Sequence, residues 1–128
     1  MAKLKKNAFD ALPVVAGRNE SFFAAVYEVV RQVPAGRVTS YGAIGSALGA
    51  RSSARMVGWA MNAAHGMIPV VPAHRVVNSQ GLLTGKFHFA TPLAMQEALE
   101  KEGITVKDDK VQDYASRFWD PALELRLD

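Results

Sequence analysis

His74 is the side chain of this sequence best suited to chemistry. It stands in a strand-like apolar segment, VPAHRVVNSQG, between Ala73 and Arg75. A histidine can act as a general base near neutral pH and can activate a neighbouring nucleophile. The residue before it is an alanine, however, and the 128-residue chain contains no cysteine. Disulfides, thiolate metal sites and thiol catalysis are therefore excluded for this chain. With 3 scattered histidines we also expect no zinc site.

Three helices are predicted before this segment. NESFFAAVYEVVRQVP has apolar residues at helical spacing between a capping Asn19 and a terminating Pro34. After a PAG turn, RVTSYGAIGSALG predicts a short helix with Thr39 as its cap. SARMVGWAMNAA predicts the next helix, capped by Ser52 or Ser53. Two short helices joined by a few residues are typical of a helix-turn-helix.

The second helix of this pair has two different faces. One is an apolar stripe that should pack inward, made of Met56, Val57, Ala60 and Met61. The other carries Arg55, Gly58, Trp59 and Asn62. An arginine beside a glycine lets a helix backbone approach DNA while the guanidinium reaches into a groove. The alternative is a solvated arginine and a tryptophan that partly covers the core.

Charge is segregated along the chain. No Asp or Glu occurs between Glu28 and Glu97, whereas the residues from Glu97 onward are rich in acids. The acid-free stretch contains the cations Arg31, Arg37, Arg51, Arg55, Arg75 and Lys86. Phosphate contacts need cations and tolerate no nearby carboxylates, so the pattern favours a surface for a polyanion. A buried, acid-poor core is the alternative.

The length predicts a single domain, and its second half is less regular than the first. Pro72 interrupts VVPAHRVV, which favours an edge strand or an irregular segment that carries a site. A loop over 82–89 follows, then a helix that begins at Thr91-Pro92 and closes on Gly103, a short strand and an amphipathic tail. No secretory apolar core and no run of about 18 apolar residues occurs. We therefore expect no membrane span and a cytoplasmic location.

Four segments resemble the O6-alkylguanine-DNA alkyltransferase family. VPAHRVV resembles the active-site motif Pro-Cys-His-Arg-Val, with alanine in the cysteine's place. VPAGRVTSYGAIGSALG resembles the first helix of the family's helix-turn-helix, ARMVGWAM its recognition helix and ALEKEG its closing helix. Together these segments cover roughly residues 20 to 106 in family order. Nothing in the sequence corresponds to the family's larger N-terminal domain.

The resemblance implies roles for individual residues. In the family, a cysteine thiolate attacks the alkyl carbon of a flipped guanine, and a histidine polarised by a glutamate through water removes the thiol proton. His74 and Glu102 match the histidine and the glutamate, and Ala73 matches the nucleophile. Alkyl transfer is therefore not expected. Tyr41 matches the tyrosine that rotates the target phosphate, and Arg55 the arginine that fills the vacated place in the stack.

The resemblance also implies two sets of contacts. DNA contacts are expected from Thr39, Ser40, Tyr41, Ser52, Ser53, Arg55 and Gly58. The lesion pocket is expected to contain Tyr41, Pro72, Ala73 and Lys86. Ala73 would widen this pocket for larger adducts, and Lys86 falls where relatives can carry an arginine. Arg75 is expected to be structural. No catalytic residue, metal or cofactor is expected, which makes Ala73, His74 and Glu102 vestigial positions.

Alkyltransferase-like proteins are family relatives that lack the reactive cysteine. They bind O6-alkylguanine in DNA and hand the lesion to nucleotide excision repair. The resemblance thus implies a mostly helical fold with a small β component, a winged helix-turn-helix. We expect an N-terminal segment (1–18), the DNA-binding domain (19–106) and a C-terminal extension (107–128) that packs on it. The expected function is recognition of O6-alkylguanine in double-stranded DNA by base flipping, by a monomer that works with nucleotide excision repair proteins.

Two alternatives stay open. His74 and Glu102 could activate water, which would make the protein a residual hydrolytic enzyme. The protein could also be a winged-helix DNA binder that does not flip bases. An intact pocket behind Ala73, lined by the loop over 82–89, would favour lesion recognition over the second alternative.

Overall fold

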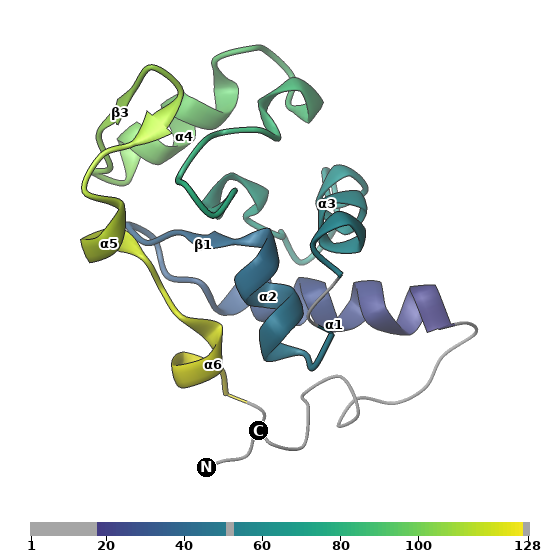
Figure 1. The fold of residues 1–128 in the computed structure, drawn as a ribbon. Helices are drawn as coiled ribbons and strands as arrows, with labels where there is room; N and C mark the ends of the chain where they lie inside the picture. Colours follow the sequence, from purple (N-terminus) through teal and green to yellow (C-terminus); the bar gives the residue numbers. More distant parts are fainter. Residues whose placement is uncertain (1–17, 51–52, 127–128) are drawn as a thin grey trace.

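The computed structural model describes residues 18–50 and 53–126 (Figure 1). Its first helix is α1 (Arg18–Gln32), and the next two helices pack on it. The predicted periodicity is confirmed, because Phe22, Val26 and Val30 are buried on one face. The helix begins at Arg18, so Asn19 lies inside it and does not cap it. None of the helices in the described residues is long and apolar enough to cross a bilayer.

Helices α2 (Tyr41–Ala47) and α3 (Ala54–Asn62) form the predicted helix-turn-helix and pack on α1 and on each other. Ser40, not Thr39, caps α2, because its Oγ accepts a hydrogen bond from the backbone N–H of Ala43 at 3.1 Å. Thr39 belongs to strand β1 (Thr39–Ser40) and is fully buried. The cap predicted at Thr39 was therefore wrong by one residue.

The turn between α2 and α3 leaves no room for a side chain at Gly45. A Cβ there would lie 2.6 Å from Ser53 Oγ and 3.0 Å from the carbonyl oxygen of Ala50. Ser53 stands at the N-cap position of α3 but makes no capping hydrogen bond. Its hydroxyl donates to the Ala50 carbonyl instead. The other predicted cap, Ser52, lies outside the described residues.

The segment VPAHRVV is a short turn followed by a short strand. A 3-10 turn, η3 (Ala73–Arg75), leads into β2 (Val76–Val77), and β2 pairs with β1 in parallel, Thr39 opposite Val76. The irregular segment predicted from Pro72 is confirmed. This pairing places η3 beside the turn that precedes β1, so the two halves of the chain meet here.

A second apolar cluster joins α4 (Ala94–Lys101) to the hairpin of β3 (Val106–Lys107) and β4 (Lys110–Val111). Helix α4 begins after the predicted Thr91-Pro92 start and ends at Lys101. Gly103, which was predicted to close the helix, follows the cap residue Glu102 with a positive φ of 88°. In Figure 1 the hairpin lies beside α4, on the opposite side of the molecule from α3. The segment that faces α3 is the loop containing the 3-10 turn η4 (Lys86–His88).

The chain beyond the hairpin, with α5 (Tyr114–Arg117) and α6 (Pro121–Glu124), returns to the first cluster. Trp119 is only 4% exposed and is part of the cluster built by α1, α2 and α3. Its backbone N–H donates to the Val38 carbonyl at 2.7 Å, and Val38 bridges Phe118 in parallel. The boundary expected after residue 106 falls inside β3.

Candidate functional site

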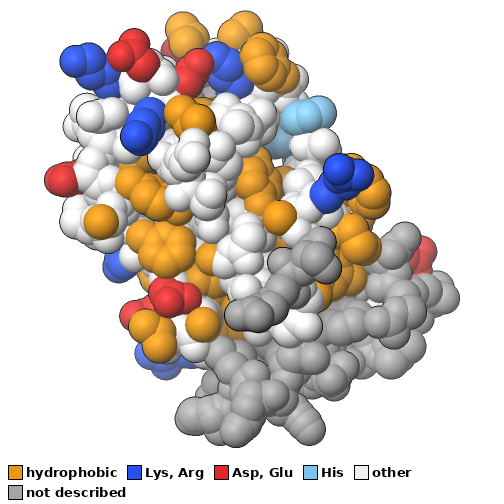
Figure 2. All heavy atoms as spheres, in the orientation of Figure 1, with side chains coloured by type: hydrophobic (Ala, Val, Ile, Leu, Met, Phe, Trp, Pro, Cys, Tyr) orange, Lys and Arg blue, Asp and Glu red, His pale blue; other side chains and the backbone are white. Residues whose placement is uncertain are grey.

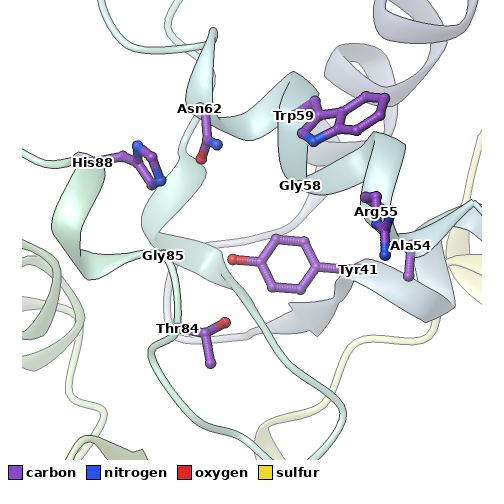
Figure 3. A pocket seen from close by; sticks show the side chains of 9 residues that line it. All are labelled: Tyr41, Ala54, Arg55, Gly58, Trp59, Asn62, Thr84, Gly85 and His88. Carbon is purple, nitrogen blue, oxygen red and sulfur yellow. The ribbon is translucent and has the colours of Figure 1, made fainter.

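An open pocket of about 300 Å³ lies between α3 and the loop that contains η4 (Figure 3). It is lined by Tyr41, Ala54, Arg55, Gly58, Trp59, Asn62, Thr84, Gly85 and His88. None of these residues is acidic. Its volume is at the lower end of the range for small-ligand sites. A pocket of this size and charge can take a planar group that is attached to a phosphate backbone.

Tyr41 forms the centre of the pocket. It is the first residue of α2, and its hydroxyl points towards the loop at Thr84 and Gly85 (Figure 3). A Cβ at Gly85 would lie 2.9 Å from this oxygen, so the glycine allows the loop to approach the phenol. Burial raises the pKa of Tyr41, and a hydrogen bond with Thr84 opposes that rise. The phenol therefore stays protonated at neutral pH and keeps a proton to donate.

The outer face of α3 supplies the other wall. Val57, Ala60 and Met61 are buried, so the inward stripe predicted from the sequence is confirmed, with Met56 partly buried beside it. The opposite side of α3 places Arg55, Gly58, Trp59 and Asn62 on the pocket. A Cβ at Gly58 would have nothing within 4 Å, which leaves open space in front of the helix.

Most cations of the acid-free stretch hold the fold together. Arg31 pairs with Glu28 at 2.9 Å. Arg37 donates to the backbone carbonyls of Arg117 and Phe118, so Arg37 is a structural residue. The DNA contact that the charge pattern suggested for Arg37 stays a prediction.

Arg55 differs from those cations. Its side chain is exposed on α3, and it makes no hydrogen bond or ion pair within the described residues. Figure 2 shows a basic side chain and a histidine over the region of α3, without an acidic side chain next to them. Charged side chains of both signs gather instead over the hairpin. Arg51 lies outside the described residues.

Glu102 joins three segments at the C-terminal end of α4. Its carboxylate accepts hydrogen bonds from Arg75, the shortest at 2.6 Å, and from the backbone N–H of Gly36 at 3.2 Å. It lies 2.7 Å from His74 Nε2, a direct contact where the resemblance implied one through water. Burial would raise the pKa of this carboxyl, but the hydrogen bonds from Arg75, His74 and Gly36 outweigh burial and lower it to about 2. Arg75 also donates to the Val33 carbonyl at 2.9 Å, in keeping with the structural role expected for it.

The residues predicted for the lesion pocket are only partly on the lining of this pocket, and their role in lesion binding stays a prediction. Tyr41 lines it, but Pro72, Ala73 and Lys86 do not. Ala73 is buried at the start of η3, 7% exposed. Lys86 turns away because its ammonium pairs with Asp109 of the hairpin at 2.6 Å.

Two of the residues expected to contact DNA have buried side chains. The side chain of Thr39 is fully buried, and Ser40 is engaged inside the protein with the N–H of Ala43 and with Tyr114. Neither side chain is free to bind a phosphate. Tyr41, Arg55 and Gly58 remain on the pocket. Ser53 is partly buried and bonded to Ala50, and Ser52 lies outside the described residues.

Sequence reasoning missed Thr84, Gly85 and His88 as individual pocket residues. They come from the loop over 82–89, which was expected to line a pocket behind Ala73, whereas Ala73 does not line this pocket. Nothing in the spacing of the three residues showed which side chains would face α3. The pKa of His65 is lowered mainly by burial and to a smaller extent by the charge of His88. His65 itself packs edge-on against Phe89, with ring centroids 4.6 Å apart.

Comparisons with known proteins agree on one family. A family model described as the DNA binding domain of 6-O-methylguanine DNA methyltransferase matches residues 21–104. Alkyltransferase-like protein 1 of Schizosaccharomyces pombe is 35% identical over 97 residues, which cover 76% of this chain and 89% of that protein. A protein of Thermus thermophilus named DNA base-flipping protein is 50% identical over 60 residues, 47% of this chain but only 39% of that protein.

A solved structure is similar over most of the chain. The crystal structure of S. pombe Atl1 in complex with damaged DNA containing O6-carboxymethylguanine superposes with a TM-score of 0.73 and 32% sequence identity. The match covers 82% of this chain and all of that one.

Proposed function

This chain belongs to the family of the 6-O-methylguanine DNA methyltransferase DNA-binding domain, and on that premise we propose that it recognises O6-alkylguanine in duplex DNA without transferring the alkyl group. The observation that carries the proposal is a carboxylate-free pocket on α3, with Tyr41 and an unpaired Arg55 on its lining. No thiol accompanies it, because Ala73 matches the cysteine position and the sequence contains no cysteine. A methyl side chain has no lone pair to accept an alkyl group.

Recognition by base flipping is the finer part of the proposal. A base that leaves the stack needs a place to go and a group to fill the gap. The pocket between α3 and the loop offers the place, and Arg55 can fill the gap because no partner holds its guanidinium. The Thermus relative named as base-flipping protein supports this reading. So does a pocket wall built by the loop at Thr84, Gly85 and His88, which a non-flipping binder would not need.

The hydrolytic alternative has no structural support. His74 and Glu102 do not line the pocket, and the Glu102 carboxylate is occupied by Arg75 and Gly36. A protein that binds a lesion and cannot repair it must pass the lesion to other proteins. We therefore include marking of the lesion for nucleotide excision repair in the proposal.

The experiment compares wild type with Arg55→Ala on two duplexes, one with O6-methylguanine and one with guanine. A 2-aminopurine next to the target base reports unstacking. Wild type should bind the lesion duplex more tightly and raise the fluorescence. Arg55→Ala should lose about 1–3 kcal/mol on the lesion duplex and less on the undamaged one. Lys107→Ala is the matched control, since Lys107 is an exposed cation on the hairpin strand β3.

Equal affinity of wild type for both duplexes would refute lesion recognition. Equal losses for Arg55→Ala on both duplexes, without a fluorescence change, would refute flipping and leave an ordinary backbone contact. Transfer of radiolabel from methylated DNA to the protein would overturn the claim that no alkyl group is transferred.

A further inference from the structure

Trp59 is exposed where a tryptophan is not expected on packing grounds. It lies on α3 with 52% of its surface accessible, whereas the buried face of this helix is formed by Val57, Ala60 and Met61. Single exposed apolar side chains are common on protein surfaces. Others in the described residues, such as Ile68, do not line the pocket, but Trp59 does. Its indole stands at the rim, beside Arg55 (Figure 3).

The Trp59 indole has no polar, aromatic or cation–π partner within the described residues. The ring pairs and the cation–π contact of the described residues involve other aromatic side chains, and the Trp59 indole has no hydrogen bond or ring partner among them. Arg55 precedes it by one helical turn, yet the guanidinium does not rest on the indole. Both side chains are therefore free at the same rim.

The space in front of the indole is open. A Cβ placed on Gly58, the residue before Trp59, would have no atom within 4 Å, so the surface of α3 is bare beside the ring. Across the pocket from Arg55, the lining consists of Asn62, which belongs to the same helix, and His88 of the loop (Figure 3). A planar ring that enters from outside can reach the indole without displacing a side chain.

We propose that Trp59 stacks on a planar ring of the lesion nucleotide at the mouth of the pocket, and that this contact helps to set the affinity for the lesion. The inference rests on the proposed function and adds a specificity-determining residue to it. Aromatic side chains bind bases through their faces and do so without hydrogen-bond readout. The ring has two possible sources, the alkylated purine itself or an aromatic O6 substituent, and both present the same flat apolar face.

Binding titrations at one salt concentration test the contact. The proteins are wild type, Trp59→Ala and Trp59→Phe, and the duplexes contain guanine, O6-methylguanine or O6-benzylguanine. Trp59→Ala should lose about tenfold in affinity for the lesion duplexes, near the lower end of the range for one base–aromatic stack, and less for undamaged DNA. Trp59→Phe should recover most of the loss. Leu123→Ala is the control, because Leu123 is an exposed apolar residue on α6, outside the pocket.

The two lesion duplexes distinguish the sources. Equal losses on both would identify the purine as the stacked ring, and a larger loss on O6-benzylguanine would identify the substituent. Either result supports the proposal. Equal losses on damaged and undamaged duplex, or no loss on any, would overturn it. A different result would refute the proposed function itself, namely that wild type binds the lesion duplexes no more tightly than the guanine duplex.

Tryptophan fluorescence provides a readout that a purely structural role would not change. The chain has two tryptophans, and Trp119 is buried. Lesion DNA should protect wild type from acrylamide quenching, because Trp59 becomes covered. The Trp59→Phe protein, which reports Trp119 alone, should show no such protection. Protection of equal size in both proteins would place the change at Trp119 and contradict the proposal.

Discussion

Glu102 is held by several hydrogen bonds in a chain that contains no cysteine. Its carboxylate binds Arg75, His74 and the backbone of Gly36, so it joins the end of α4 to η3 and to the turn after α1. In a catalytic site the same carboxylate would polarise the histidine, which would then remove a proton from the nucleophile. Here its partners make it a structural residue, and its contribution can be measured as stability.

Stability should depend on the protonation of Glu102. Its pKa falls from 4.5 to about 2 on folding, so the folded state favours the carboxylate. That stabilisation is complete above pH 4.5 and is lost as the pH falls through about 2. Glu102→Gln should lower the free energy of unfolding at neutral pH by about 2 kcal/mol and flatten its dependence on pH in this range. Urea unfolding at a series of pH values measures both effects.

Glu97→Gln is the control for this measurement, since Glu97 is an exposed acid on the same helix with no ion pair in the described residues. It should leave the pH profile close to that of wild type. A Glu102→Gln profile with the wild-type slope would show that Glu102 does not carry the acid sensitivity.

At the scale of elements, two glycines have opposite roles in the helix-turn-helix. Gly45 faces the turn, where a Cβ would meet Ser53 Oγ and the Ala50 carbonyl. Gly58 faces open space on the pocket side of α3. The same substitution should therefore give opposite results at the two positions.

Gly45→Ala should destabilise the protein by about 1–3 kcal/mol, because the turn must open to admit the methyl group. Gly58→Ala should stabilise it by about 0.5–1 kcal/mol, since alanine costs less entropy in a helix. If Gly58 lets the helix approach DNA, as we propose, Gly58→Ala should also weaken DNA binding. Thermal unfolding and a DNA titration on both variants check this. Equal changes in melting temperature would contradict the geometry of the turn.

At the scale of the molecule, the C-terminal residues close the main apolar cluster. Trp119 fills it, Val38 pairs with Phe118, and the hairpin bridges the loop at Leu82 through Lys110. Arg117 adds hydrogen bonds to the carbonyls of Gly36 and Gly103. We therefore propose that residues after 106 are an integral part of the domain.

Trp119→Ala should cost about 3–5 kcal/mol of unfolding free energy, because it leaves a cavity among α1, α2 and α3. A chain that ends at residue 106 should fail to unfold cooperatively. Leu123→Ala, at a site that is 80% exposed, should change little. Denaturant unfolding followed by circular dichroism measures all three. A cooperative transition for the shortened chain would show that the C-terminal residues are an appendage.

Local pattern was enough for several features. The periodicity of α1 and the two faces of α3 follow from spacing along one helix, and the lack of a nucleophile at Ala73 follows from composition. The likeness of VPAHRVV and ARMVGWAM to family motifs was also visible in the residues, and the family match confirms it. Each of these depends on residues close together in the chain.

The tertiary structure alone decided which polar side chains remain available. Arg37 and Lys86 looked like DNA-facing cations in the sequence, but carbonyls near Phe118 and the carboxylate of Asp109 occupy them. Thr39 is buried because β1 pairs with a strand far along the chain. His88 reaches the pocket because the loop folds back on α3. Spacing along the chain cannot predict such contacts, since they depend on how distant segments pack.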